Sequence, residues 1–369
     1  MTKMFAVILA LALGAAVANF AQAQDGSCSS SKPCPPGYCC SKWNYCGQGS
    51  EYCGNTPPAP PYGGTPPHHP SPSHPSPPHH PSPPSPPSPS HPGGKGKIAA
   101  YWGQNGNEGP LDKVCASDSY EIILLSFLNE FGNFQRPMLN LAGHCDPYSH
   151  GCTVLSGQIK SCQSSGVKVL LSLGGGDSPG RLVSDADAAD LAKRLWASFL
   201  GGDSSDRPLG DAVLDGIDLD VESGATPELY AGLVRHLRSI AGSSKVLVSA
   251  APQCPFPDAN LGSAVQTPGL FDFIFVQFYN NPPCAYVDGD DGKLLDSWKQ
   301  WTSSIPSAKI YLGLPASPSA AGSGFLPAHV ATSSVLPEIK SSHNYGGVML
   351  WSVFYDQQES YSESIQSSV

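Results

Sequence analysis

One segment of the chain alternates acidic and aliphatic residues as a β-strand does. In the run from Asp215 to Glu222, the acids Asp218, Asp220 and Glu222 alternate with three aliphatic residues, Ile217, Leu219 and Val221. Successive side chains of a strand point to opposite faces, so the three acids share one face. Acids packed side by side repel one another and lose hydration, so the fold must give that face a special environment.

The alternation has one functional interpretation and two simpler ones. The simpler ones are a solvated edge strand and a structural calcium site. The apolar residues Ala212-Val213-Leu214 directly precede the run, and they indicate a buried strand over Ala212–Glu222 rather than an edge. We therefore favour a catalytic strand that ends in a general acid, Glu222, and we expect Asp215 to be structural.

The first residues have the pattern of a secretory signal. Met1–Ala23 combines a basic start at Lys3, an apolar run and Ala21-Gln22-Ala23 as a cleavage site. The apolar run is too short to span a bilayer, and no later segment could span one. We expect a secreted protein, either extracellular or vacuolar. Twelve cysteines agree with this expectation, because secreted chains keep disulfides.

The formal net charge of -10 bears on the partners of the chain. An acidic chain without a basic cluster is a poor candidate for binding nucleic acid or an anionic membrane. The sequence contains no Asn-X-Ser/Thr acceptor for N-glycosylation. We expect a monomer that needs no cofactor and no metal.

Residues 24–54 form a small cysteine-rich module. A segment of this size cannot build an adequate apolar core, so disulfides must hold it together. A zinc site is the alternative, which the secreted context and the spacing of the cysteines disfavour. The aromatic residues of the module either cover the disulfides or offer flat rings to the C–H faces of sugars. The six cysteines are Cys28, Cys34, Cys39, Cys40, Cys46 and Cys53.

The run Cys34-Pro-Pro-Gly-Tyr-Cys-Cys-Ser-Lys-Trp-Asn-Tyr-Cys-Gly47 resembles a hevein-type chitin-binding domain. The resemblance implies that N-acetylglucosamine units bind Ser41, Trp43, Tyr45 and Tyr52. It also implies disulfides that pair Cys28 with Cys40, Cys34 with Cys46, and Cys39 with Cys53. Proline takes over after Cys53, so this is a shortened form with six cysteines.

Residues 55–95 are rich in proline, serine and histidine. Apolar residues are nearly absent, so the segment cannot pack, and its proline density favours an extended spacer. The alternatives are metal capture by its histidines and a motif that docks a partner. The histidines are His68, His69, His74, His79, His80 and His91.

Residues 96–369 repeat one pattern, a short apolar strand followed by a polar or helical section. Helices are predicted at Asp185–Leu200 and Pro227–Ala241. Eight strand–helix repeats favour a (β/α)8 barrel, an α/β fold, over a doubly wound sheet, because Gly103-Gln104-Asn105-Gly106 lacks the phosphate-binding glycine pattern. The predicted strands are Ile98–Trp102, Ile122–Phe127, Val167–Leu173, Ala212–Glu222, Val246–Ala251, Phe273–Phe278, Ile310–Leu314 and Val348–Trp351.

The chemistry of such a barrel lies where its strands end, at the C-terminal face. Polar and aromatic residues that converge there with carboxylates are typical of a sugar site. Tyr101 and Trp351 could instead be core aromatics, and Gly174-Gly175-Gly176 could be only a tight turn. The candidate residues at the strand ends are Tyr101, Gln104, Asn105, Gly174, Gly175, Gly176, Asp220, Glu222, Gln277, Tyr279, Asn280 and Trp351.

Four segments of residues 97–369 resemble plant class III chitinases of glycoside hydrolase family 18. They are Tyr101–Gly109, Asn140–Cys145, Ala251–Pro257 and Val276–Cys284. The resemblance adds Asn140 to the residues that bind substrate. It implies cis peptides at Ser126–Phe127 and Trp351–Ser352, and the disulfides Cys115–Cys162, Cys145–Cys152 and Cys254–Cys284. Asp177, which follows the glycines, departs from the family pattern, and we expect it to alter a sugar subsite.

The resemblance implies a retaining, substrate-assisted mechanism, in which the acetamido oxygen of the substrate attacks C1. Glu222 would be the acid and then the base, and Asp220 would orient the acetamide. Tyr279 would hydrogen-bond the acetamido oxygen, and Asp218 would share a proton with Asp220. The expected function is a chitin-degrading endochitinase that acts in plant defence on the fungal cell wall. The alternatives are a catalytically weak chitin-binding lectin or inhibitor, and a chitinase that also acts on peptidoglycan.

Overall fold

The computed structural model describes residues 39–40, 46–47, 97–287 and 289–369. The chain divides into two compact units, Met1–Pro87 and Ser88–Val369. In the first unit, β1 (Cys39–Cys40) pairs with β2 (Cys46–Gly47) in antiparallel fashion. The predicted signal segment, the sugar-binding residues of the module and the linker lie outside the described residues.

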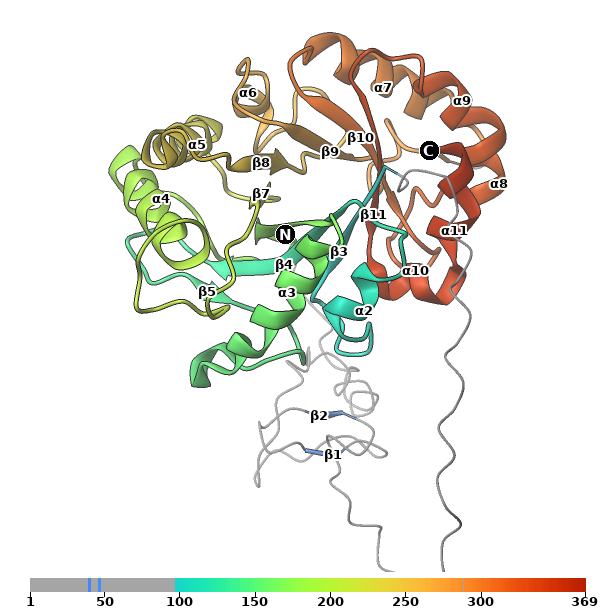
Figure 1. Cartoon of the computed structure of the whole chain (residues 1–369). Helices are drawn as coiled ribbons and strands as arrows, with labels where there is room; N and C mark the ends of the chain where they lie inside the picture. The colour runs from blue at the N-terminus through green and yellow to red at the C-terminus, as the bar shows by residue number, and fades with distance from the viewer. Residues whose placement is uncertain (1–38, 41–45, 48–96, 288) are drawn as a thin grey trace, which may run out of the picture. The chain divides into compact units, whose positions relative to one another are not determined.

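The second unit is a closed barrel of parallel strands, so the predicted (β/α)8 fold is confirmed (Figure 1). The strand order is β3-β11-β10-β9-β8-β7-β6-β4, and pairing of β3 with β4 closes it. The strands are β3 (Ile98–Trp102), β4 (Ile122–Glu130), β6 (Lys168–Gly174), β7 (Gly216–Asp220), β8 (Leu247–Ala250), β9 (Phe273–Gln277), β10 (Lys309–Pro315) and β11 (Tyr345–Trp351).

Helices surround the barrel on the outside, where α4 and α5 lie side by side (Figure 1). Ser184 caps α4 by accepting a hydrogen bond from the Asp187 amide at 3.1 Å. None of the helices in the described part of the chain is long and apolar enough to cross a membrane. The α-helices are α2 (Leu111–Cys115), α3 (Leu155–Ser164), α4 (Asp185–Phe199), α5 (Pro227–Ala241), α6 (Gly262–Val265), α7 (Gly292–Ser304), α8 (Ala328–Val330), α9 (Leu336–Ile339), α10 (Val353–Glu359) and α11 (Tyr361–Ile365).

Three predicted strands differ in length by three residues or more from those observed. The strand predicted over Ala212–Glu222 covers only Gly216–Asp220, and β11 begins at Tyr345 instead of Val348. Just before β7, the Asp215 carboxylate accepts hydrogen bonds from the Val169 amide and the Gln163 side chain. The expected structural role of Asp215 is therefore confirmed. Strand β4 runs three residues past Phe127 and pairs with β5 (Met138–Leu139), a short antiparallel strand that the sequence pattern did not predict.

The apolar core has two layers. A large layer between the strands and the helices contains Ile217 and Leu219 of β7. A smaller layer inside the barrel contains Tyr101, Phe127 and other residues from alternate strand positions. The acids of β7 lie on the inward face and its aliphatic residues on the outward face. The alternation of acidic and aliphatic residues in the sequence therefore corresponds to the inner and outer layers of the barrel.

Three disulfides join Cys115 to Cys162, Cys145 to Cys152, and Cys254 to Cys284, the pairs that the family resemblance implies. The last of them connects the segment after β8 to the segment after β9. Cis peptides occur at Ser126–Phe127 and Trp351–Ser352, as the resemblance also implies, and at Phe256–Pro257. The Cys254–Cys284 disulfide therefore links two segments at the strand ends, whereas Cys115–Cys162 joins α2 to α3.

We predict that Gly174→Ala destabilises the barrel by at least about 3 kcal/mol. Gly174 has a φ of +117°, and an added Cβ would lie 2.0 Å from the Asp220 carbonyl oxygen. Thermal unfolding of the isolated protein measures the loss. Gly157→Ala in α3 is the control, because its Cβ would meet nothing within 4 Å, and this helical substitution should stabilise slightly. Equal melting temperatures for Gly174→Ala and the wild type would contradict the prediction.

Candidate active site

Asp218 is a fully buried carboxylate with three hydroxyl donors. Ser172 and Ser249 each donate to it at 2.7 Å, and Tyr101 donates at 3.0 Å. The strand register places the serines, because Asp218 pairs with Ser172 of β6 on one side and with Ser249 of β8 on the other. Burial raises the pKa of Asp218, and the three hydrogen bonds to its charged form oppose that rise.

Asp220 lies one strand repeat further along the inward face and is almost fully buried. The Gln277 amide nitrogen donates to its Oδ1 at 2.9 Å and also to the Ala251 carbonyl oxygen at 3.0 Å. Burial, followed by the charges of Glu222 and Asp218, raises the pKa of Asp220 well above its usual value. Three neighbouring acids resist full ionisation, and Asp220 has one donor where Asp218 has three, so the proton is favoured on Asp220.

Glu222 lies two residues beyond the end of β7 and is partly exposed. Burial raises its pKa, while hydrogen bonds from Gln253 and Gln277 lower it and the charges of Asp177 and Asp258 raise it further. A carboxyl whose pKa is raised in this way keeps its proton closer to neutral pH than a free glutamate does. Glu222 can therefore donate a proton, which is the property expected of a general acid.

Two of the three glycines, Gly174 and Gly175, lie where a larger residue would not fit, and a Cβ on Gly175 would lie 2.8 Å from the Phe127 ring. A Cβ on Gly176 would lie 3.7 Å from Glu222 Oε2, an ordinary contact distance. The Gly175 amide also donates to the Asp220 carbonyl oxygen at 2.8 Å. The segment is a tight turn, as one interpretation of the sequence had it, and it brings the backbone close to the candidate acid.

Aromatic residues pack together beside the acids. The Trp351 ring is 5.5 Å from the Tyr101 ring and 6.0 Å from the Phe127 ring, measured between centroids. Tyr101 is buried and is therefore part of the core as well as of the site, whereas Trp351 remains partly exposed. Tyr279 is also buried, and burial together with the charges of Asp220 and Glu222 raises its pKa well above the usual value. Its hydroxyl is thus a neutral hydrogen-bond donor.

Three residues predicted to bind substrate make hydrogen bonds that fix loops. Gln104 donates through Nε2 to the carbonyl oxygens of Ser126 and Asn140, at 2.8 and 2.9 Å. The Asn140 side chain accepts from the Ala142 amide at 3.1 Å. Asn280 accepts from the amides of two residues, Gly322 and Ser323. Their side-chain oxygens and amides are therefore partly occupied within the protein, and substrate binding by them stays a prediction.

The segment after β8 contributes residues that the strand-end argument did not include. Asp258 is buried and accepts hydrogen bonds from the amides of Gln253, Asn260 and Leu261. The Asn260 side chain donates to the carbonyl oxygen of Glu222 at 2.9 Å. The same argument, applied to the end of the strand predicted over Val246–Ala251, would have indicated Gln253.

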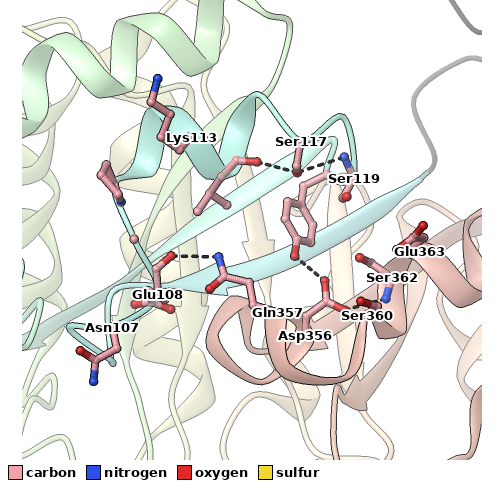
Figure 2. A pocket seen from close by; sticks show the side chains of 14 residues that line it. Asn107, Glu108, Lys113, Ser117, Ser119, Asp356, Gln357, Ser360, Ser362 and Glu363 are labelled. Carbon is pink, nitrogen blue, oxygen red and sulfur yellow. Dashed lines mark hydrogen bonds between the residues drawn. The ribbon is translucent and has the colours of Figure 1, made fainter.

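A cavity of about 330 Å³ lies on the flank of the barrel and contains none of the acids of β7 (Figure 2). Gln357 donates to the Glu108 carbonyl oxygen in its wall, and Tyr120 donates to Asp356. The buried Glu108 carboxylate accepts from the Gly103 amide at 2.6 Å and is 3.0 Å from His144 Nε2. The cavity thus lies behind the loop that carries Gln104. Among the described residues, no group of three His, Cys, Asp or Glu side chains could hold a metal ion.

Comparison with known proteins identifies the family. Residues 97–324 match the model of glycosyl hydrolases family 18. The chain belongs to this family. The acidic endochitinase of Vitis vinifera is 56% identical over 277 residues, which cover 74% of this chain and 92% of that protein. Family membership and this similarity confirm the prediction of an enzyme of the chitinase class.

Solved structures of the family resemble the barrel. The ICChI chitinase from Ipomoea carnea has a TM-score of 0.71 at 48% identity, and the match covers 74% of this chain and all of that one (100%). The xylanase and α-amylase inhibitor protein XAIP-II from Scadoxus multiflorus has a TM-score of 0.70 at 42% identity, with 74% of this chain and 99% of that one covered. Barrels similar to this one thus occur in a protein described as a chitinase and in one described as an inhibitor.

We predict that Asp177→Asn lowers the pKa of Glu222, because it removes a negative charge that disfavours the Glu222 carboxylate. Asp177 is exposed, so the displacement is a fraction of a pH unit and shrinks as salt is added. A ¹³C NMR titration of the Glu222 carboxyl measures it. Asp203→Asn, a change of another exposed acid, is the control and should leave the titration unchanged. A higher pKa of Glu222 in Asp177→Asn would refute the effect attributed to the Asp177 charge.

Proposed function

We propose that the protein is a secreted endochitinase that cleaves β-1,4 links of chitin with retention of configuration. The observation that carries the proposal is the layout of the inward face of β7. A fully buried Asp218 with three hydroxyl donors lies beneath a buried Asp220, and a partly exposed Glu222 follows at the open end. Membership of glycosyl hydrolases family 18 supports the same assignment.

The mechanism uses the acetamido group of the substrate as the nucleophile. Its carbonyl oxygen attacks C1 while the glycosidic C1–O bond breaks, and Glu222 gives its proton to the leaving oxygen. This forms an oxazolinium ion, whose positive charge Asp220 stabilises. Tyr279 donates a hydrogen bond to the acetamido oxygen, and its raised pKa keeps that proton in place. Water then attacks C1 and the bond from C1 to the acetamido oxygen breaks, while Glu222 takes a proton from that water, so the two inversions give net retention.

The proton on Asp220 must move when positive charge develops on the acetamide. Asp218 lies below Asp220 and is the acceptor that we propose for it, so that the pair shares one proton. The hydroxyls of Ser172, Ser249 and Tyr101 keep Asp218 charged until that proton arrives. This sharing lets Asp220 become an anion only when the substrate needs one.

Sugar units bind along the open end of the barrel in this proposal. The partly exposed Trp351 gives an apolar platform for a sugar ring, and Gly175, whose backbone packs against the Phe127 ring, is a further residue proposed to contact substrate. Asp177 next to the glycine turn alters a subsite on the Glu222 side. The polar residues proposed to contact substrate are Gln104, Asn140, Gln277 and Asn280.

The N-terminal segments would anchor this enzyme to its polymer. We propose that residues 24–54 bind chitin through Ser41, Trp43, Tyr45 and Tyr52, and that residues 55–95 form the spacer. An anchor on a spacer raises the effective concentration of the catalytic domain at an insoluble surface. Action on fungal cell walls in plant defence, a monomeric state and an extracellular or vacuolar location complete the proposal.

A second candidate function is a lectin or inhibitor on the same barrel. The similarity to a protein described as a xylanase and α-amylase inhibitor favours it. The acids Asp218, Asp220 and Glu222 and the hydroxyl of Tyr279 argue for an enzyme, because a binding protein has no need of three neighbouring buried or half-buried carboxyls. Cleavage of peptidoglycan as an additional activity remains an alternative for the same site.

We predict that the protein hydrolyses a soluble chitin oligosaccharide and that Glu222→Gln lowers kcat by about 10²–10⁴-fold, the usual cost of losing a general acid. Glutamine keeps the shape of the side chain but has no proton of suitable acidity to give. ¹H NMR of the wild-type reaction should show the β-anomer first, because retention preserves configuration at C1.

The control for this experiment is Glu359→Gln, an exposed acid on α10 that should leave kcat unchanged. Initial formation of the α-anomer would rule out the retaining mechanism. Chitin binding without turnover by the wild type would make the protein a lectin instead of an enzyme.

We predict that deletion of residues 24–95 lowers activity on solid chitin severalfold and spares activity on soluble oligosaccharides. The anchor matters only where the substrate cannot diffuse to the site. Parallel assays of the full mature chain and the shortened chain on both substrates measure the effect. An equal loss on both substrates would show that the deleted residues support the catalytic domain and not its attachment.

A further inference from the structure

The orientation of the Gln253 side chain follows from a chain of hydrogen bonds. Asn281 Nδ2 is 3.1 Å from the Tyr279 carbonyl oxygen, and a carbonyl oxygen can only accept a hydrogen bond. The amide nitrogen of Asn281 is therefore the end that faces both Tyr279 and Gln253 Oε1, which lies 3.2 Å away. Because its oxygen accepts from Asn281, Gln253 can use its own amide nitrogen as the donor to another group.

That other group is the Glu222 carboxyl. The Gln253 segment lies against Glu222, because Asp258 accepts from the amides of both Gln253 and Asn260, and the Asn260 side chain donates to the Glu222 carbonyl oxygen at 2.9 Å. Hydrogen bonds from the side chains of Gln253 and Gln277 lower the pKa of Glu222. The Gln277 amide nitrogen also donates to the Asp220 carboxylate and to the Ala251 carbonyl oxygen, so its two hydrogens are shared among three acceptors. Gln253 makes no such competing donation in the described part of the chain, so it is the stronger donor to Glu222.

The backbone of Gln253 is held as firmly as its side chain. Asp258 Oδ2 accepts from its amide at 3.1 Å, and Gln253 bridges to Gln277 at the end of β9. The neighbouring Cys254 forms a disulfide with Cys284, which ties this segment to the one that carries Asn281. The donor and the residue that orients it thus belong to two loops that are covalently joined.

We propose that Gln253, oriented by Asn281, is a positioning residue that holds and tunes the general acid Glu222. This inference rests on the proposed function of Glu222 and adds two residues to it. The donation from Gln253 holds the Glu222 carboxyl in place to give its proton to the glycosidic oxygen and later to take one from water. Its hydrogen bond favours the carboxylate, which is the form that must act as the base in the second half of the reaction.

The hydrogen bond from Gln253 opposes the effect that acidic groups of the neighbouring segments have on the pKa of Glu222. Asp177 follows β6, Asp220 is on β7, Asp258 follows β8, and Tyr279 follows β9. Negative charge on any of them disfavours the Glu222 carboxylate, and burial does the same. Against these effects, hydrogen bonds from Gln253 and then from Gln277 lower the pKa of Glu222. The amide of Gln253 is thus the main group that stabilises the ionised form.

We predict that Gln253→Leu moves the alkaline limb of kcat/KM to higher pH by about one unit, the cost of one hydrogen bond to a charged group. The limb reports the loss of the Glu222 proton, and without the donor that proton is lost at higher pH. Asn281→Leu should move the limb in the same direction by a smaller amount, because Gln253 is then free to turn. The double variant should match Gln253→Leu, since Asn281 acts through Gln253.

The assay uses the full mature chain with a soluble chitin oligosaccharide, together with thermal unfolding to show that each variant is folded. Gln266→Leu is the control, because the Gln266 side chain donates only to the Gly262 carbonyl oxygen and should leave the limb in place. If Gln253→Leu lowered the rate at every pH but did not move the alkaline limb of kcat/KM, Gln253 would have a purely structural role and the inference would be overturned. Should the wild type show no hydrolysis, the proposed function fails, and a ¹³C NMR titration of Glu222 in the same variants still decides the inference.

Discussion

The structure depends on how the barrel interior accommodates a buried charge at Asp218. A carboxylate without water or donors would be costly there, because an isolated charge in an apolar interior is strongly destabilising. The register of β6, β7 and β8 puts a serine hydroxyl on each side of it, and Tyr101 of β3 reaches it from across the barrel. These hydroxyls can donate without adding charge, so Asp218 retains its charge next to a second acid.

The second acid takes its chemical character from the first. With Asp218 stabilised as an anion, Asp220 carries the cost of burial and of two neighbouring charges, and its raised pKa follows. A glycine turn and the aromatic rings of Phe127 and Trp351 enclose the same space. A side chain at Gly174 would clash with the Asp220 backbone, and a large side chain at Gly176 would obstruct the approach to Glu222. The barrel therefore determines both the charge state of the acids and the room that a sugar has beside them.

The sequence predicted the barrel and the acidic strand because both depend on local patterns. Alternation of acids with Ile217, Leu219 and Val221 is a property of eight neighbouring residues, and it corresponds to the inner and outer layers observed. The bounds of β7 were not predictable from the local pattern, and Asp215 just before the strand accepts hydrogen bonds from residues about fifty positions earlier in the chain. The hydrogen-bond partners of Gln253 were also not predictable from the sequence, because Asn281 comes close to Gln253 through the pairing of β8 with β9 in the folded barrel. Of the predicted module, the structure describes only the pairing of β1 with β2, and the predicted linker lies outside the described residues.

The inner acids Asp218 and Asp220 lie on a strand, whereas the general acid Glu222 and its neighbours lie in loops. Asp218 and Asp220 belong to β7, where every neighbour is fixed by strand register, so a change there alters the fold as well as the charge. Glu222 lies beyond the strand, and its neighbours Asp177, Gln253 and Asp258 come from loops that follow other strands. Loop residues can change with little cost to the barrel, because they contribute few apolar contacts. The acidity of the proton donor can therefore change through these loops without any change in the inner acids, and Asp177 is one position where the charge of a loop residue acts on Glu222.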